Sequence, residues 1–102
     1  MAKVFAFLAT GSEEVENLAV VDVLVRAGIE VKLVSVTGDR EVVTSHNVHI
    51  VTDAVFEEVD CREADVLFIP GGLPGTTNMM AHEGLCAALK EAAQSGRRVA
   101  AI

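Results

Sequence analysis

The sequence predicts an α/β protein built on a doubly wound, mostly parallel sheet, and three observations support this fold class. Nearly unbroken apolar runs alternate along the chain with segments of helical character. The apolar runs have the composition of parallel strands that are buried on both faces. Glycine and proline punctuate the junctions between these segments. The length of 102 residues has room for one domain at most.

The first third of the chain predicts a strand, a helix and a second strand. Residues 3–9 are typical of a central parallel strand, and residues 29–36 form the next apolar run. Between them, the Ser12 hydroxyl is suited to cap a helix that continues to about Ala27. Apolar residues occupy more than one face of this helix, so we expect a second surface to cover it besides the sheet.

The rest of the chain predicts a hairpin and a further strand, helix and strand. Two short runs flanking a polar turn, residues 41–43 and 48–51, predict a small hairpin appended to the main sheet. Residues 64–69 predict a buried strand that leads into a glycine-rich loop. An amphipathic helix over residues 82–95 and a final strand over residues 98–102 complete the pattern.

Composition excludes several classes of function. The formal net charge of −7 disfavours binding to phosphate backbones and to anionic membranes. No apolar run reaches the roughly 18 residues of a membrane span, and the N-terminus lacks a signal-peptide pattern, so we expect a soluble cytoplasmic protein. Two cysteines without Cys-x-x-Cys spacing predict free thiols rather than a zinc knuckle or a disulfide framework.

Three segments are expected to meet at the carboxyl-end edge of the sheet: residues 11–16, the loop at Gly71 and Gly72, and the end of the last strand at Ile102. The two glycines lack a Cβ, so their backbone N–H groups can approach an anionic oxygen. Glu16 follows Glu13 by one helical turn, and like charges at this spacing favour protonation of one carboxyl, which makes Glu16 a candidate proton donor.

The remaining chemistry-bearing residues predict no further site. The helix-start residues Glu13 and Glu14 are interpreted as solvated carboxylates that stabilise the helix N-terminus. The histidines His46, His49 and His82 are scattered without an i, i+4 pair, so no metal site is predicted.

Neither cysteine is predicted to be a nucleophile. Cys86 lies beside Leu85 in the last predicted helix and is expected to be a buried, inert thiol. Cys61 follows Asp60 in a polar stretch, and a negative neighbour is expected to raise its pKa.

The chain carries two motifs in order: Gly-Ser-Glu-Glu-Val-Glu at residues 11–16 and Pro-Gly-Gly at residues 70–72. Together they resemble the motifs of the ThiJ/PfpI superfamily, and the resemblance is closest to the branch of the parkinsonism-associated deglycase. The resemblance implies that residues 1–102 are the N-terminal part of a single longer domain of the class I glutamine amidotransferase-like type. It also implies a flavodoxin-like three-layer sandwich, incomplete here, that forms a homodimer and needs no cofactor.

The resemblance further implies roles for particular residues. The nucleophilic cysteine of the family corresponds to the position after Ile102, so residues 1–102 alone are not expected to catalyse. Glu16 corresponds to the carboxylic acid that hydrogen-bonds this thiolate, and Gly71 and Gly72 to the backbone donors for the oxyanion. Arg26 and His46 correspond to residues near the dimer interface.

The function implied for the whole protein is that of a cysteine-dependent glyoxalase or deglycase acting on methylglyoxal or on early glycation adducts. Three other functions stay open at this point. The protein could be a redox-sensing chaperone of the same family, or a peptidase or amidase relative, which requires a positioned histidine. A flavin-binding module is disfavoured because the chain has no Trp or Tyr to stack on the ring.

Overall fold

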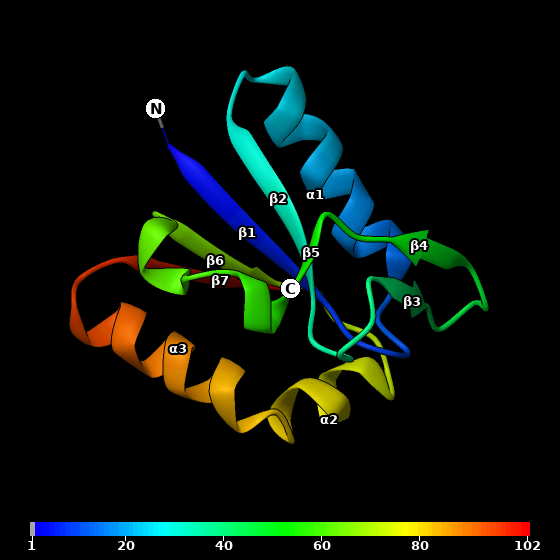
Figure 1. Ribbon diagram of the computed structural model, residues 1–102. Helices are drawn as coiled ribbons and strands as arrows, with labels where there is room; N and C mark the ends of the chain where they lie inside the picture. The colour runs from blue at the N-terminus through cyan, green and yellow to red at the C-terminus, as the bar shows by residue number, and fades with distance from the viewer. Residues whose placement is uncertain (1) are drawn as a thin grey trace.

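The computed structural model describes residues 2–102 and places a five-stranded parallel sheet at the centre of the molecule, in the order β5-β2-β1-β6-β7 (Figure 1). Every strand pairing in this sheet is parallel, and β1 lies in the middle, as the sequence predicts. The strands are β1 (Lys3–Leu8), β2 (Glu30–Ser35), β5 (Ala54–Val55), β6 (Val66–Ile69) and β7 (Arg98–Ala101).

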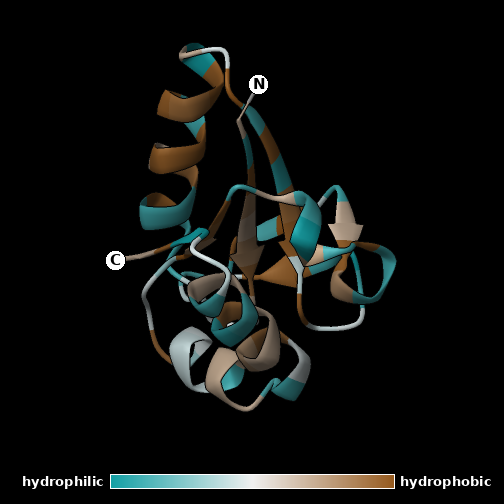
Figure 2. Ribbon diagram, turned by 90° about the vertical axis from the view of Figure 1, so that its left-hand side faces the viewer, coloured by the Kyte–Doolittle hydropathy of each residue, from teal (hydrophilic) through white to brown (hydrophobic). Residues whose placement is uncertain are grey.

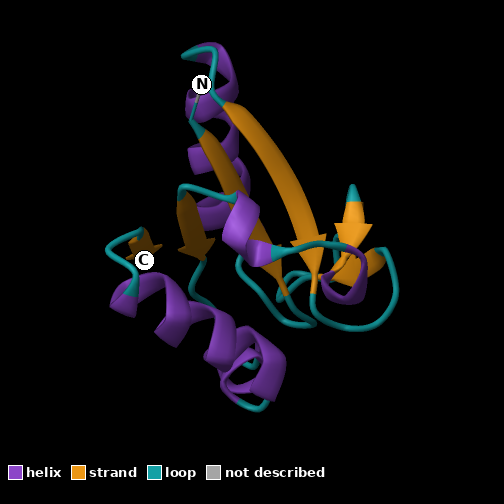
Figure 3. Cartoon of the chain, turned by 60° about the vertical axis from the view of Figure 1, so that its left-hand side comes forward, coloured by secondary structure: helices purple, strands orange, loops and turns teal. Residues whose placement is uncertain are grey.

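Helices cover both faces of this sheet, which confirms the predicted α/β architecture (Figure 3). Side chains of β1 alternate between the two faces, as the pleat of a strand requires. Phe5 and Phe7 pack on the side of Leu85, which belongs to α3 (Glu83–Gln94). Val4 and Ala6 pack on the other side, where α1 (Glu14–Arg26) contributes apolar side chains. The buried central strand therefore holds two separate cores together.

The predicted hairpin is present as a two-stranded antiparallel sheet of its own, formed by β3 (Glu41–Val43) and β4 (His49–Val51). It lies beside the start of α1 (Figure 1). Two backbone hydrogen bonds attach it there: the Gly11 N–H donates to the Val43 carbonyl at 2.9 Å, and the Ser45 N–H donates to the Ser12 carbonyl at 2.9 Å.

The predicted helix cap at Ser12 is wrong. The N-cap of α1 is Glu13, whose carboxylate accepts a hydrogen bond from the Val15 N–H at 2.7 Å. The Ser12 hydroxyl instead accepts from the Ala9 N–H at 3.0 Å and is fully buried. The reason is position: Ser12 lies one residue before the cap, in the turn that closes the end of β1.

Several short elements lie in stretches to which the sequence analysis assigns no strand or helix. They are the helix α2 (Gly75–Met80), the strand β5 and the 3-10 turns η1 (Phe56–Glu58) and η2 (Cys61–Glu63). Each is too short to show a hydrophobic period, which is the main signal of secondary structure in a sequence. No helix within residues 2–102 is long and apolar enough to cross a membrane.

The expectation that α1 is apolar on more than one face is confirmed. Figure 2 shows hydrophobic segments along the length of this helix. Val15, Val23 and Val25 are 65%, 63% and 57% exposed, on the side away from the sheet. A shallow hollow of about 320 Å³ lies on the same helix, lined by Ala19, Val20, Val23 and Leu24.

Candidate active site

The three segments expected to meet at the carboxyl-end edge of the sheet do so around Glu16. The Gly71 N–H, in the loop after β6, donates a hydrogen bond to Glu16 Oε1 at 2.9 Å. The end of β7 lies alongside, because the Ile102 N–H donates to the Ile69 carbonyl at 3.1 Å. A Cβ built on Gly71 would collide with Glu16 Oε1 and lie 3.1 Å from the Ile102 carbonyl oxygen. A side chain at this position would displace the Glu16 carboxylate from its hydrogen bond and crowd the end of β7.

The neighbouring Gly72 is required by its backbone conformation as well as by space. Its φ is +98°, a region that residues with a side chain rarely adopt. A Cβ here would lie 2.6 Å from the Glu13 backbone nitrogen. The loop and the helix start are joined at this point, since the Glu13 N–H donates to the Gly71 carbonyl at 2.9 Å.

The hydrogen-bonding capacity of this site is only partly used. Glu16 is half-buried, and only its Oε1 accepts a hydrogen bond; within residues 2–102 its Oε2 has no partner. The Gly71 N–H is already engaged by Glu16, whereas the Gly72 N–H has no acceptor in the described part of the chain. One carboxyl oxygen and one backbone donor are thus available to a ligand or to another group at this edge.

Two asparagines that the sequence analysis did not single out hold the turn between β1 and α1. Asn17 is fully buried, and its Nδ2 donates to the Phe7 carbonyl at 3.3 Å. Asn78, on α2, donates through Nδ2 to the Thr10 carbonyl at 2.7 Å. Asn17 immediately precedes the apolar run of residues 18–21 in α1, and an uncharged amide at that place was the signal that could have identified it. Both amides position the segment that carries Glu16.

A second group of polar residues lies at the start of α1, where the hairpin turn meets the helix. The His46 Nδ1, on the hairpin turn, lies 2.7 Å from Glu14 Oε1 and 3.9 Å from Glu13 Oε2. Glu14 is only 8% exposed, so its interpretation as a solvated residue is wrong; the hairpin turn covers it. Burial raises the pKa of the Glu14 carboxyl, but hydrogen bonds, including that from His46, outweigh burial and leave the pKa below its usual value.

The structure does not bring Arg26 to this edge. Arg26 lies in the last turn of α1, about 18 Å along the helix axis from Glu14, and its guanidinium pairs with Asp22 at 3.0 Å. The resemblance implies that Arg26 and His46 are both near the dimer interface. Within one chain, Arg26 lies at the C-terminal end of α1 and His46 lies beside its N-terminal end.

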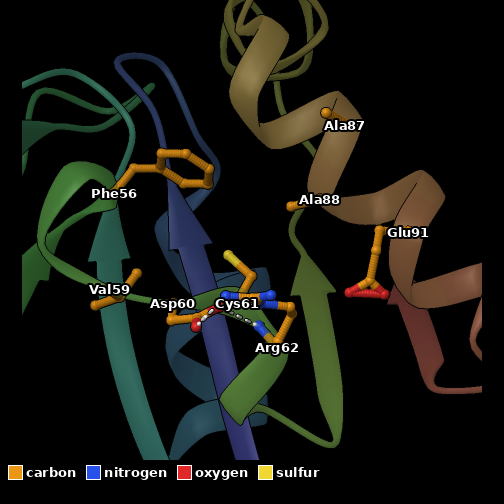
Figure 4. Close-up of a pocket in the computed structure, with 8 residues that line it drawn as sticks. All are labelled: Phe56, Val59, Asp60, Cys61, Arg62, Ala87, Ala88 and Glu91. Atoms are coloured by element: carbon orange, nitrogen blue, oxygen red, sulfur yellow. Dashed lines mark hydrogen bonds and ion pairs between the residues drawn. The ribbon is translucent and has the colours of Figure 1, made fainter.

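The two cysteines differ from each other in burial. Cys61 is buried, and burial, with a smaller contribution from Asp60, raises the pKa of its thiol to about 11, so the predicted direction is right. Figure 4 shows its sulfur directed into the space between Phe56 and α3, in a hollow of about 390 Å³. Cys86 is exposed, contrary to the prediction, because the adjacent Leu85 occupies the face of α3 that turns inward.

The DJ-1/PfpI family model matches residues 2–102. The chain belongs to the DJ-1/PfpI family. This confirms the resemblance drawn from the two motifs, and with it the flavodoxin-like α/β fold.

Among curated relatives, Protein DJ-1 homolog B of Arabidopsis thaliana is 37% identical over 95 residues, which is 93% of this chain and 22% of that protein. The glutathione-independent glyoxalase DJR-1.2 of Caenorhabditis elegans is 32% identical over 89% of this chain and 48% of its own length.

Two solved structures extend the comparison. The oxidized form of Toxoplasma gondii DJ-1 has a TM-score of 0.95 and 35% identity, over 99% of this chain and 55% of that one. A cysteine-to-alanine mutant of a DJ-1 superfamily protein from Salmonella typhimurium has a TM-score of 0.92 and 30% identity, over 99% of this chain and 55% of that one. The chain thus spans about half the length of these DJ-1 structures.

Proposed function

We propose that the whole protein is a cysteine-dependent glyoxalase or deglycase acting on methylglyoxal or on early glycation adducts. The observation that carries the proposal is the hydrogen bond of 2.9 Å from the Gly71 N–H to Glu16 Oε1, at the end of β7. This contact leaves the Glu16 Oε2 free to face a group that follows Ile102. The C. elegans relative named as a glyoxalase supports the same reaction class.

In this proposal the nucleophile is a cysteine after Ile102. Its thiolate adds to the aldehyde carbon of methylglyoxal to form a hemithioacetal, a proton shifts from the aldehyde carbon to the adjacent carbon, and water releases lactate and the thiolate. Glu16, when protonated, donates through Oε2 to the thiolate, which favours the thiolate over the thiol, and its carboxyl assists the proton shift between the two carbons. The oxyanion formed on addition is held by the free N–H of Gly72.

Lactate formation from methylglyoxal without glutathione tests this function. We expect Glu16→Gln to lower kcat by about 100-fold or more, because the amide cannot transfer a proton. Glu83→Gln is the matched control, since Glu83 is an exposed carboxylate in the first turn of α3. Equal activity of the Glu16→Gln variant and the control would contradict the assigned role of Glu16.

Redox sensing is a second candidate, favoured by the oxidized state of the Toxoplasma relative. Under this alternative the thiolate is oxidised and turnover of dicarbonyls is incidental. The two functions separate in the Glu16→Gln variant: loss of lactate formation with peroxide sensitivity unchanged indicates an enzyme. Loss of peroxide sensitivity in a protein that never formed lactate indicates a sensor.

We also propose that the protein is a homodimer that uses the uncovered side of α1. The exposed Val15 on α1 and the exposed Val51 at the end of β4 support this, at 65% and 67% exposure. Burying apolar surface of this kind is the usual driving force of association between identical chains.

A further inference from the structure

Three side chains from two distant parts of the chain form what we term the Glu–Glu–His cluster: Glu13, Glu14 and His46. One ligand atom of each residue lies within 4.8 Å of the others. Zinc bonds of about 2.0–2.2 Å place two tetrahedral ligand atoms roughly 3.3 Å apart. The observed distances from His46 Nδ1, 2.7 Å to Glu14 and 3.9 Å to Glu13, lie on either side of that spacing.

The cluster also contains a buried carboxylate oxygen that lacks a partner. Glu14 Oε2 is buried and has no hydrogen-bond partner within residues 2–102. The Thr44 hydroxyl contributes to the lowered pKa of Glu14 but does not reach hydrogen-bond geometry with Oε2. An unpaired buried oxygen of this kind is costly, and more so when the group is charged. Glu14 thus presents a buried carboxylate with one oxygen unpaired, beside the Oε1 that faces His46.

No lysine or arginine within residues 2–102 neutralises these carboxylates. The ion pairs of Glu13 and Glu14 are both with His46, and no lysine or arginine in residues 2–102 pairs with either carboxylate. Two adjacent carboxylates thus share a single imidazole, which carries at most one positive charge. A divalent cation balances both carboxylates at once.

We propose that the Glu–Glu–His cluster binds a divalent first-row transition ion, with zinc as the representative. Two carboxylate oxygens and an imidazole nitrogen are a ligand set that suits zinc. Calcium and magnesium are poorer candidates, because they prefer six or more oxygen ligands. The His46 side chain is 64% exposed, so water can reach the ion and complete its coordination.

The ligands are held in place by the backbone before any ion binds. Glu13 is fixed by three contacts of its own: Oε1 accepts from Val15 N–H, its N–H donates to the Gly71 carbonyl, and its carbonyl accepts from Asn17 N–H. The hairpin turn that carries His46 is attached to the helix start through the Ser45 N–H. A bound ion would cross-link β3–β4 to α1 next to the loop that contacts Glu16.

Zinc titration by calorimetry, together with cobalt as a spectroscopic probe, tests the site. We expect one zinc per chain at this cluster, and we expect His46→Ala to weaken that binding by at least about tenfold. The matched control is His49→Ala: His49 lies on the same hairpin, also contacts a carboxylate at 2.6 Å through Glu41, and is similarly exposed, but has no second carboxylate. His49→Ala should bind zinc as the unaltered protein does.

Cobalt separates this site from the thiols, because thiolate ligands give an intense charge-transfer band that oxygen and nitrogen ligands lack. We expect cobalt to bind without that band and to be displaced by zinc. Absence of binding, a thiolate band, or equal affinity of His46→Ala and His49→Ala would overturn the proposal. Glu13→Gln, whose amide oxygen can still cap the helix, gives a second variant for which weaker zinc affinity is expected. None of these readouts depends on the proposed glyoxalase activity.

Discussion

The two ends of α1 differ in what they bury: apolar side chains such as Val20 and Leu24 pack on the sheet along its later turns, whereas the most deeply buried residues lie at its start and are polar. Its buried residues, Glu14 and Asn17, are polar, whereas Val15, Val23 and Val25 are more than half exposed. The polar residues lie at the N-terminal end, where the helix meets β1, the hairpin and the glycine loop. Polar groups are costly to bury unless they are hydrogen-bonded. The hydrogen bonds that these buried residues make hold the start of α1, and with it Glu16, in place. The apolar outer side is instead suited to contact with further protein surface.

The largest expected effect tests the tight junction at the N-terminal end. Gly72→Ala should destabilise the fold by about 3 kcal/mol, because it combines a positive φ with overlap of the Glu13 backbone. Gly28→Ala is the control: Gly28 has a similar φ of +81° but open space around it, so we expect about 1 kcal/mol. Denaturant unfolding measures both. Equal losses would mean that packing at the junction contributes nothing.

The two cysteines lie on the other face of the sheet from α1 and also differ in burial. We expect iodoacetamide to modify Cys86 at least about tenfold faster than Cys61 at neutral pH, because burial and the raised pKa keep Cys61 an inaccessible thiol. Peptide mapping by mass spectrometry gives both rates. Comparable rates would show that the 3-10 turn carrying Cys61 opens readily.

The same shift has a consequence for stability at alkaline pH. The thiol of Cys61 ionises near 9.0 in the unfolded chain and near 11 in the fold, so its contribution to stability is present below pH 9 and is lost as the pH rises through about 11. The slope of unfolding free energy against pH in this window should be reduced in Cys61→Ala.

A smaller loss of unfolding free energy is expected from removing the buried amide of Asn17, which follows Glu16 in α1. Asn17→Ala should cost about 1 kcal/mol, because it removes the hydrogen bond to the Phe7 carbonyl but also removes an Oδ1 that has no partner. Gln94→Ala, at an exposed position of α3, should change the unfolding free energy by less than about 0.5 kcal/mol. A change at Asn17 no larger than this control would contradict its positioning role.

The smallest expected effect on folding stability comes from the outer side of α1. Val15→Glu should change the unfolding free energy of a single chain by less than about 0.5 kcal/mol, since Val15 is 65% exposed. The same substitution should convert the proposed dimer to a monomer in analytical ultracentrifugation. A dimer unaffected by this charge would locate the interface elsewhere.

The sequence predicts those parts of the fold that have a strong hydrophobic period. The strands β1, β2, β6 and β7, the helices α1 and α3, and the hairpin are confirmed within one or two residues at each end. The sequence also predicts that three segments meet: residues 11–16, the loop at Gly71 and the end of β7. They meet because the carboxyl ends of parallel strands share one edge of the sheet.

Other features depend on contacts between distant segments and left no local signal. The Glu–Glu–His cluster joins residues 32 positions apart, so histidine spacing alone predicts no metal site there. Burial of Glu14 arises from the hairpin turn folding over it. Exposure of Cys86 depends on the rotation of α3 about its axis, which Leu85 settles by filling the core.

Lactate formation from methylglyoxal by the whole protein, with no glutathione present, tests the central claim most directly. The account predicts one lactate for each methylglyoxal consumed, with turnover lost in Glu16→Gln and retained in Glu83→Gln. Methylglyoxal left unconsumed by the folded protein, or turnover undiminished in Glu16→Gln, would contradict it.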